Sequence, residues 1–157
     1  MATDFDNAIS RLNEFSNFEK KAHILKPAFS LDGITAILRR LGNPHKKYNN
    51  IHVAGTVGKG SVCFMLDSAL RASGHKTGLY TSPHITDLRE RIRAGGKMIS
   101  KADFARMFDA VAGKGKADPR EHTYFEAITA MAFQYFAERG VEIAVIETGL
   151  GGRLDST

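Results

Sequence analysis

Three short apolar runs alternate with amphipathic helical stretches, and this order restricts the fold more than any other feature of the sequence. The runs cover residues 51–54, 77–81 and 143–146, and each is bounded by glycine or polar residues. Their length and flanks are typical of buried strands. Strands that alternate with helices form a parallel sheet covered by helices on both faces. We therefore expect an α/β fold of this kind.

The predicted helices carry apolar residues at intervals of three and four positions. Polar residues that cap helices stand before most of them, and a glycine follows the end of most of them. Residues 83–99 and 113–122 are rich in glycine or charge, and we expect them to be loops. The apolar stripes fall within residues 5–12, 31–41, 62–70, 104–111 and 125–136.

Composition limits the class of protein. The 157 residues suffice for one domain with a core, and 43% hydrophobic and 25% charged residues are ordinary for a globular protein. No apolar run is long enough to span a membrane, and the single cysteine excludes an internal disulfide. The net charge of +5 is spread along the chain without a basic block, which argues against nucleic acid as a partner. The first residues lack the features of a signal peptide, and we expect a cytoplasmic protein.

The stretch HVAGTVGKGSV follows the first predicted strand and leads into a helix. Glycines there allow a sharp turn and leave backbone N–H groups uncovered, so that these groups and the helix N-terminus can hold phosphate oxygens. Lys59 adds a positive charge for the outer phosphates, and the hydroxyl of Thr56 or Ser61 can contact phosphate or Mg²⁺. These residues predict a P-loop made of Gly55, Thr56, Val57, Gly58, Lys59, Gly60 and Ser61.

The match to the general P-loop pattern is incomplete. Val53 stands where the pattern has its first glycine, and Gly60 separates Lys59 from Ser61. A glycine-rich turn that binds no ligand is the alternative. A dinucleotide-binding turn fits less well, because Cys63 occupies a position that would need glycine or alanine.

Two further strand ends carry polar side chains. Glu147 follows the third strand directly and precedes a glycine-rich segment, while Ser82 ends the second strand. Ligands of open α/β sheets bind at the carboxyl ends of strands, so Glu147 is placed to hold Mg²⁺ near the phosphate loop. The alternatives are a solvated carboxylate and a turn-forming Ser-Pro pair. We interpret His84 as a solvated loop residue and Cys63 as a small core residue.

Four segments in this order resemble one family. They are AGTVGKGS, TSPHI followed by RERI, TYFE, and ETGLGGRLDST. Together they are similar to the N-terminal part of folylpolyglutamate synthase/dihydrofolate synthase, in the Mur ligase superfamily, over essentially the whole chain. The resemblance implies an ATP-dependent ligase with a partial Mur ligase-like central domain. Such an enzyme would add L-glutamate to dihydropteroate or folate through an acyl phosphate.

The resemblance also assigns residues. Lys59 and Glu147 would take part in catalysis, with ATP on residues 55–61 and Mg²⁺ on Ser82 and Glu147. Thr123, Phe125 and Asp155 would contact the pterin. An aromatic face can stack on such a ring and a carboxylate can accept its N–H groups, although Thr123 also fits a helix cap and Phe125 a core position.

The chain departs from the family at two motif positions and in its length. Val57 and Arg89 replace residues that are usually asparagine, and members of the family continue into a second, C-terminal domain. We therefore expect a truncated single domain over residues 1–157, without complete turnover on its own and with a tendency to self-associate. A stand-alone nucleotide-binding module and an inactive fragment are the alternatives to a ligase.

Overall fold

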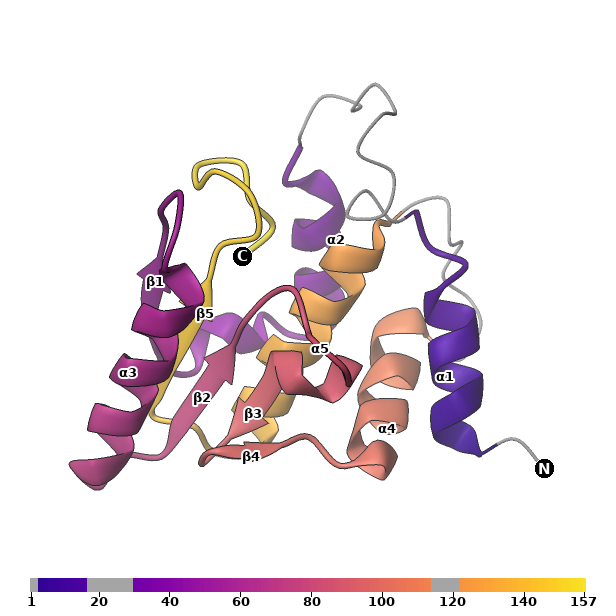
Figure 1. Ribbon diagram of the computed structural model, residues 1–157. Coiled ribbons are helices and arrows are strands. Elements are labelled where there is room, and N and C mark those ends of the chain that lie inside the picture. The colour runs from indigo at the N-terminus through magenta and orange to yellow at the C-terminus, as the bar shows by residue number, and fades with distance from the viewer. Residues whose placement is uncertain (1–2, 17–29, 114–121) are drawn as a thin grey trace.

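One five-stranded sheet lies at the centre of the computed structural model, which describes residues 3–16, 30–113 and 122–157 (Figure 1). The three predicted strands are confirmed as the parallel strands of this sheet. Two short antiparallel strands extend it on one side. The strand order is β1 (Asn49–Val53), β5 (Ile143–Glu147), β2 (Thr77–Tyr80), β3 (Ile92–Ala94) and β4 (Lys97–Met98).

The central position of β5 brings three strand ends to one edge of the sheet. β5 pairs in parallel with β1 and with β2, and in this register Val53 lies opposite Glu147 and Tyr80 opposite Ile146. The carboxyl ends of the three parallel strands therefore align within about one residue. In Figure 1 the loop after β1 and the segment after β5 rise at the upper left, and the segment after β2 rises nearer the middle of the picture.

Five α-helices of the described residues pack around the sheet, and all five were predicted. Side chains cap three of the N-termini, with capping boxes at Thr3 and Thr123 and a serine cap at Ser100, whereas α2 has no side-chain cap. No helix of the described residues is long and apolar enough to cross a membrane. The helices are α1 (Asp4–Leu12), α2 (Asp32–Arg40), α3 (Lys59–Ala72), α4 (Lys101–Ala112) and α5 (Tyr124–Glu138), with 3₁₀ turns η1 (Pro44–Lys46) and η2 (Leu88–Arg91).

The sheet separates two apolar cores of very different size. On one face, α5 packs with α1, α2 and α4 in a large cluster that includes Tyr80 and Ile146 of the sheet. On the other face, α3 covers a small cluster of Cys63, Leu79 and Val145. Successive strand residues point to opposite faces, so both faces of β2 and β5 are buried and the expected two-sided covering is confirmed.

Two predictions about local structure were wrong. The stripe assigned to the buried side of α3 included Val62 and Met65, but both side chains are exposed, and Cys63 and Asp67 face the sheet instead. Residues 83–99 were predicted as loop, yet they contain η2 and the β3–β4 hairpin. The predicted loop at 113–122 lies mostly outside the described residues.

Candidate functional site at the strand ends

The glycine-rich loop between β1 and α3 leaves a helix N-terminus open. Gly58 has a left-handed conformation with φ of +77° and forms the N-cap of α3, and no side chain caps this end. Glycine adopts this conformation without the strain that a β-carbon would bring. Gly55, Thr56 and Val57 are exposed along the loop. The N–H groups of the first turn are therefore available to an anion, in the part of the chain that the structure describes.

Lys59 begins α3 and is half-buried beside the loop. A β-carbon built on Gly55 would lie 3.6 Å from Cγ of Lys59, so the lysine stem runs alongside the loop backbone. The positive end of the helix dipole and the lysine charge thus lie at the same place, and both favour a negatively charged ligand.

The carboxylate of Glu147 lies between the glycine-rich loop before α3 and the end of β2. Glu147 is 5% exposed, and its Oε2 accepts a hydrogen bond of 3.0 Å from the backbone N–H of Ser82. On the side of the helix, a β-carbon on Gly60 would lie 3.6 Å from the same oxygen. The structure thus brings together Gly60, Ser82 and Glu147, which the sequence placed on three separate segments.

The pKa of the Cys63 thiol, in the first turns of α3, depends on the charged groups of this site. Burial, together with the negative charge of Glu147, raises the pKa of Cys63 to about 11, and the positive charge of Lys59 opposes this change. Cys63 therefore stays a neutral thiol within the small core, as the sequence indicated.

The protein side chains at this site would provide only some of the ligands that a cation needs. Within the described residues, no group of three or more histidine, cysteine, aspartate or glutamate side chains is placed to hold a metal ion. A buried carboxylate and a nearby serine beside an uncapped helix N-terminus nevertheless have the chemistry that suits Mg²⁺, which binds through one or two protein oxygens together with water and phosphate.

Glu90 organises the loop that follows β2 and was not singled out in the sequence. Its carboxylate accepts hydrogen bonds from the backbone N–H groups of Ile85, Thr86 and Asp87 and from the Thr86 hydroxyl. These bonds, first among them the one from Ile85, lower the pKa of Glu90 to about 2. Asp87 and Glu90 form a capping box at η2, and this spacing was the signal that could have identified the pair.

The residues assigned to the pterin lie around the segment that follows β5. Phe125 is half-buried, its ring centroid is 6.1 Å from that of Tyr80, and it contacts Gly149. Thr123 uses its hydroxyl oxygen to accept a hydrogen bond from the N–H of Glu126. Thr123 therefore acts as a helix cap in this structure.

Asp155 holds the segment after β5 in a closed turn. Its carboxylate accepts hydrogen bonds of 2.7 Å from the N–H of Leu150 and 3.0 Å from the N–H of Thr157. The acidic group is thus engaged by its own loop, and Gly149 of that loop adjoins Phe125.

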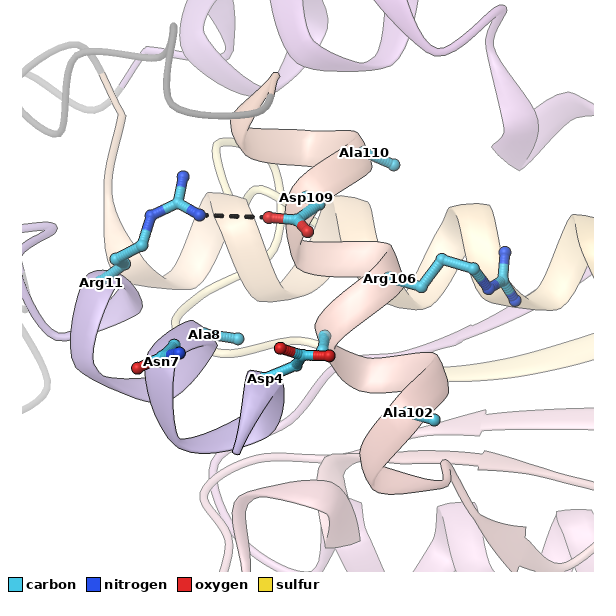
Figure 2. A pocket seen from close by; sticks show the side chains of 9 residues that line it. Asp4, Asn7, Ala8, Arg11, Ala102, Arg106, Asp109 and Ala110 are labelled. Atoms are coloured by element: carbon cyan, nitrogen blue, oxygen red, sulfur yellow. Dashed lines mark hydrogen bonds and ion pairs between the residues drawn. The ribbon is translucent and has the colours of Figure 1, made fainter. Parts of the chain in front are cut away.

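A groove of about 620 Å³ lies elsewhere, between α1 and α4 (Figure 2). Alanine side chains form its floor, and an ion pair of 3.1 Å between Arg11 and Asp109 crosses it. Its other charged side chains, Asp4 and Arg106, are exposed. The α1 and α3 helices lie on opposite sides of Figure 1, so this groove is not part of the strand-end site.

Known proteins resemble the chain over part of their length, although no protein-family model matches it. A probable bifunctional folylpolyglutamate synthase/dihydropteroate synthase of Haloferax volcanii is 40% identical over 98% of this chain and 18% of its own. The dihydrofolate synthase/folylpolyglutamate synthase of Mycobacterium tuberculosis is 41% identical over 82% of this chain and 28% of its own. A solved FPGS–AMPPCP–folate complex superposes with a TM-score of 0.86 at 35% identity, covering 99% of this chain and 37% of that protein.

Proposed function

We propose that the chain forms the nucleotide-binding part of a cytoplasmic amide ligase. The proposal rests on its similarity to folylpolyglutamate and dihydrofolate synthases, although the chain spans well under half of their length. The reaction would use ATP to join L-glutamate to dihydropteroate or to folate. The observation that carries the proposal is the meeting of Gly60, Ser82 and Glu147 at the strand ends, beside an uncapped helix N-terminus.

In this reaction the substrate carboxylate attacks the γ-phosphorus of ATP and ADP leaves, giving an acyl phosphate. The amine of L-glutamate then attacks the acyl carbon, and an amide forms as phosphate departs. The N–H groups of the first turn of α3 and the charge of Lys59 would hold the phosphates and neutralise charge that develops during transfer. This role accounts for glycines at positions where side chains would cover the loop.

Glu147 and Ser82 would hold Mg²⁺ next to the phosphates. Bound there, the ion would supply charge neutralisation for the phosphate oxygens. The hydrogen bond from the Ser82 backbone uses one carboxylate oxygen of Glu147 and fixes its orientation, so that the other oxygen remains for a cation.

Phe125 is the better candidate of two neighbouring rings for the pterin. Tyr124 is buried at 4% exposure, whereas Phe125 is half-buried and lies beside Gly149 at the end of β5. A flat heteroaromatic ring could stack on the exposed part of Phe125. The closed turn around Asp155 would form the adjoining wall.

Calorimetric titration with ATP, in the presence and absence of Mg²⁺, tests the proposal. We expect Lys59→Ala to weaken binding under both conditions. Glu147→Gln keeps an acceptor for the Ser82 N–H and should abolish only the gain in affinity that Mg²⁺ brings. Equal affinity in the wild type and Lys59→Ala, with both shown to be folded by circular dichroism, would reject the phosphate site.

A second titration separates the ligase from a stand-alone nucleotide-binding module. Only the ligase predicts that the chain binds dihydropteroate or folate, with fluorescence quenching that Phe125→Ala reduces. Nucleotide binding without any response to either pterin acid would favour the module, and no binding of any ligand would favour an inactive fragment.

A further inference from the structure

The N-terminus of α2 has no capping residue of its own and is satisfied by a side chain of α5. Its N-cap position is Leu31, whose side chain has no hydrogen-bond acceptor. The backbone N–H of Ile34, in the first turn of α2, donates a hydrogen bond of 3.0 Å to Oε1 of Glu126. This N–H is one of the four that a helix leaves without an acceptor of its own. Glu126 of α5 therefore acts as the cap of α2.

The other oxygen of the same carboxylate serves the first turn of α5. Oε2 of Glu126 accepts a hydrogen bond of 2.7 Å from the backbone N–H of Thr123, whose hydroxyl oxygen accepts one from the N–H of Glu126. Glu126 is 6% exposed. The positive ends of both helix dipoles favour a carboxylate at this place. One buried side chain thus joins the first turn of α2 to the first turn of α5.

Gly33 leaves the room that this carboxylate needs. A β-carbon built on Gly33 would overlap with Oε1 of Glu126 and lie 3.0 Å from its Cδ. Gly33 lies within α2 and does not have a left-handed conformation, so the helix itself does not require glycine there. Alanine is normally the better helix former at such a position. The contact with Glu126 therefore accounts for the glycine.

The first turn of α5 also carries Phe125, which stands between the two partners of its capping box. The ring of Phe125 rests against the backbone of Gly149. Helix ends fray, so the place of this ring depends on what holds the first turn. One further bond holds it, since the backbone N–H of Tyr124 donates to the carbonyl oxygen of Ser16 at 2.9 Å.

We propose that Glu126 is a positioning residue, which keeps the ring of Phe125 against Gly149 by tying the first turn of α5 to α2. Glu126 acts through Phe125, because its own two oxygens are engaged by backbone N–H groups. A pterin acid that stacks on Phe125 would therefore bind less tightly once Glu126 is changed. This effect on binding rests on the proposed function, whereas the placement of the ring does not.

Urea denaturation tests the link between the two helices without any ligand. We expect Gly33→Ala to lower the urea midpoint of the wild type, because the new methyl group displaces the carboxylate. In a Glu126→Ala background the same substitution should raise the midpoint, since only the helix preference for alanine remains. If Glu126→Ala does not fold, Glu126→Asp, with its shorter side chain, takes its place. A decrease of the same size in both backgrounds would overturn the proposal.

Proton NMR tests the placement of the ring, through the nuclear Overhauser effect between the Phe125 ring and the α-protons of Gly149. Glu126→Gln keeps the size of the side chain but has a single acceptor oxygen, so it can serve only one of the two N–H groups. We expect the effect to weaken in Glu126→Gln and to persist in Ser100→Ala, the matched control, which removes the cap of α4 instead. An unchanged effect in Glu126→Gln would mean that the bond to Ser16 suffices, and would overturn the proposal.

Calorimetric titration with dihydropteroate and, separately, with ATP tests the consequence for binding. Glu126→Gln should weaken dihydropteroate binding about tenfold, the scale of one lost hydrogen bond, and leave ATP affinity unchanged. Ser100→Ala should change neither affinity. An equal loss for both ligands, or no loss for either, would refute a positioning role in binding. A wild type that binds no dihydropteroate would reject the proposed function, and the NMR result would then decide the role of Glu126.

Discussion

A β-carbon on Gly149 would lie 2.6 Å from Cζ of Phe125, so the phenyl ring rests directly on the backbone of the segment after β5. This spacing is closer than a real side chain tolerates, and relief would require a shift of the ring or of the backbone. The position of Phe125, and with it the wall proposed for the pterin, therefore depends on the absence of a side chain at residue 149.

Gly149→Ala should displace Phe125 and destabilise the protein by about 1–3 kcal/mol, the usual cost of an extra methyl group in a packed site. Urea denaturation followed by circular dichroism measures the change. Gly152→Ala is the matched control, because its new β-carbon would meet only Cβ of Ala54 at 3.9 Å. An equal effect of the two substitutions would mean that contact with Phe125 is not the cause.

Thr123→Ala should lower the free energy of unfolding by about 1 kcal/mol, because it removes the side-chain cap of α5. Thr123→Ser keeps the hydroxyl oxygen and should restore most of the loss in thermal or urea denaturation. If serine fails to restore stability, the methyl group of Thr123 contributes and the cap is not its main role. Binding of a pterin acid, measured on the same variants, separates the cap from a substrate contact.

The three parallel strands and the helices between them could be predicted because the apolar runs, the helix caps and the terminal glycines all indicated the same elements. The β3–β4 hairpin was missed, yet its turn carried a signal. Gly95 and Gly96 have φ values of +56° and +77°, which is the pattern of a two-residue hairpin turn with adjacent glycines. The charged residues around this turn, which include the fully buried Arg91, led instead to the prediction of a loop over residues 83–99.

The sequence could predict that Ser82 and Glu147 lie at the same site, because parallel strands bring their carboxyl ends to one edge of the sheet. The buried face of α3 could not be predicted, because Val62 and Met65 have the same apolar character and spacing as a core stripe. Only contact with the sheet selects Cys63 and Asp67, and Asp67 is buried because it accepts a hydrogen bond from Thr77. Such pairing across distant segments has no local signal.

Alkaline pH should destabilise the protein through Cys63. Its pKa is raised by burial from the ordinary value of 9.0 to about 11, so the folded chain holds this proton more tightly than the unfolded chain. The free energy of unfolding should therefore fall as pH rises from about 9 to about 11. Cys63→Ala should flatten this decline in urea titrations at several pH values, and an unchanged slope would show that other groups cause it.

We propose that the chain self-associates through the side that carries β1 and α3. Strand β1 pairs with β5 alone among the described strands, and the neighbouring α3 exposes Val62 and Met65. An unpaired edge next to apolar side chains favours association. Sedimentation should show concentration-dependent oligomers that Met65→Lys reduces and Ile85→Lys, on the loop after β2, does not. A monomeric wild type at all concentrations would contradict this.

The small core of Cys63, Leu79 and Val145 has a consequence for how the two sides of the sheet move. Opening α3 exposes far less apolar surface than opening α5, so amide hydrogens of α3 should exchange with solvent through local fluctuations before the rest of the domain unfolds. A ligand on the phosphate loop would slow that exchange, because it binds only when α3 is docked. Nucleotide affinity would then depend on substitutions at the far end of α3, which contact no ligand but alter the fraction of molecules in which the helix is in place.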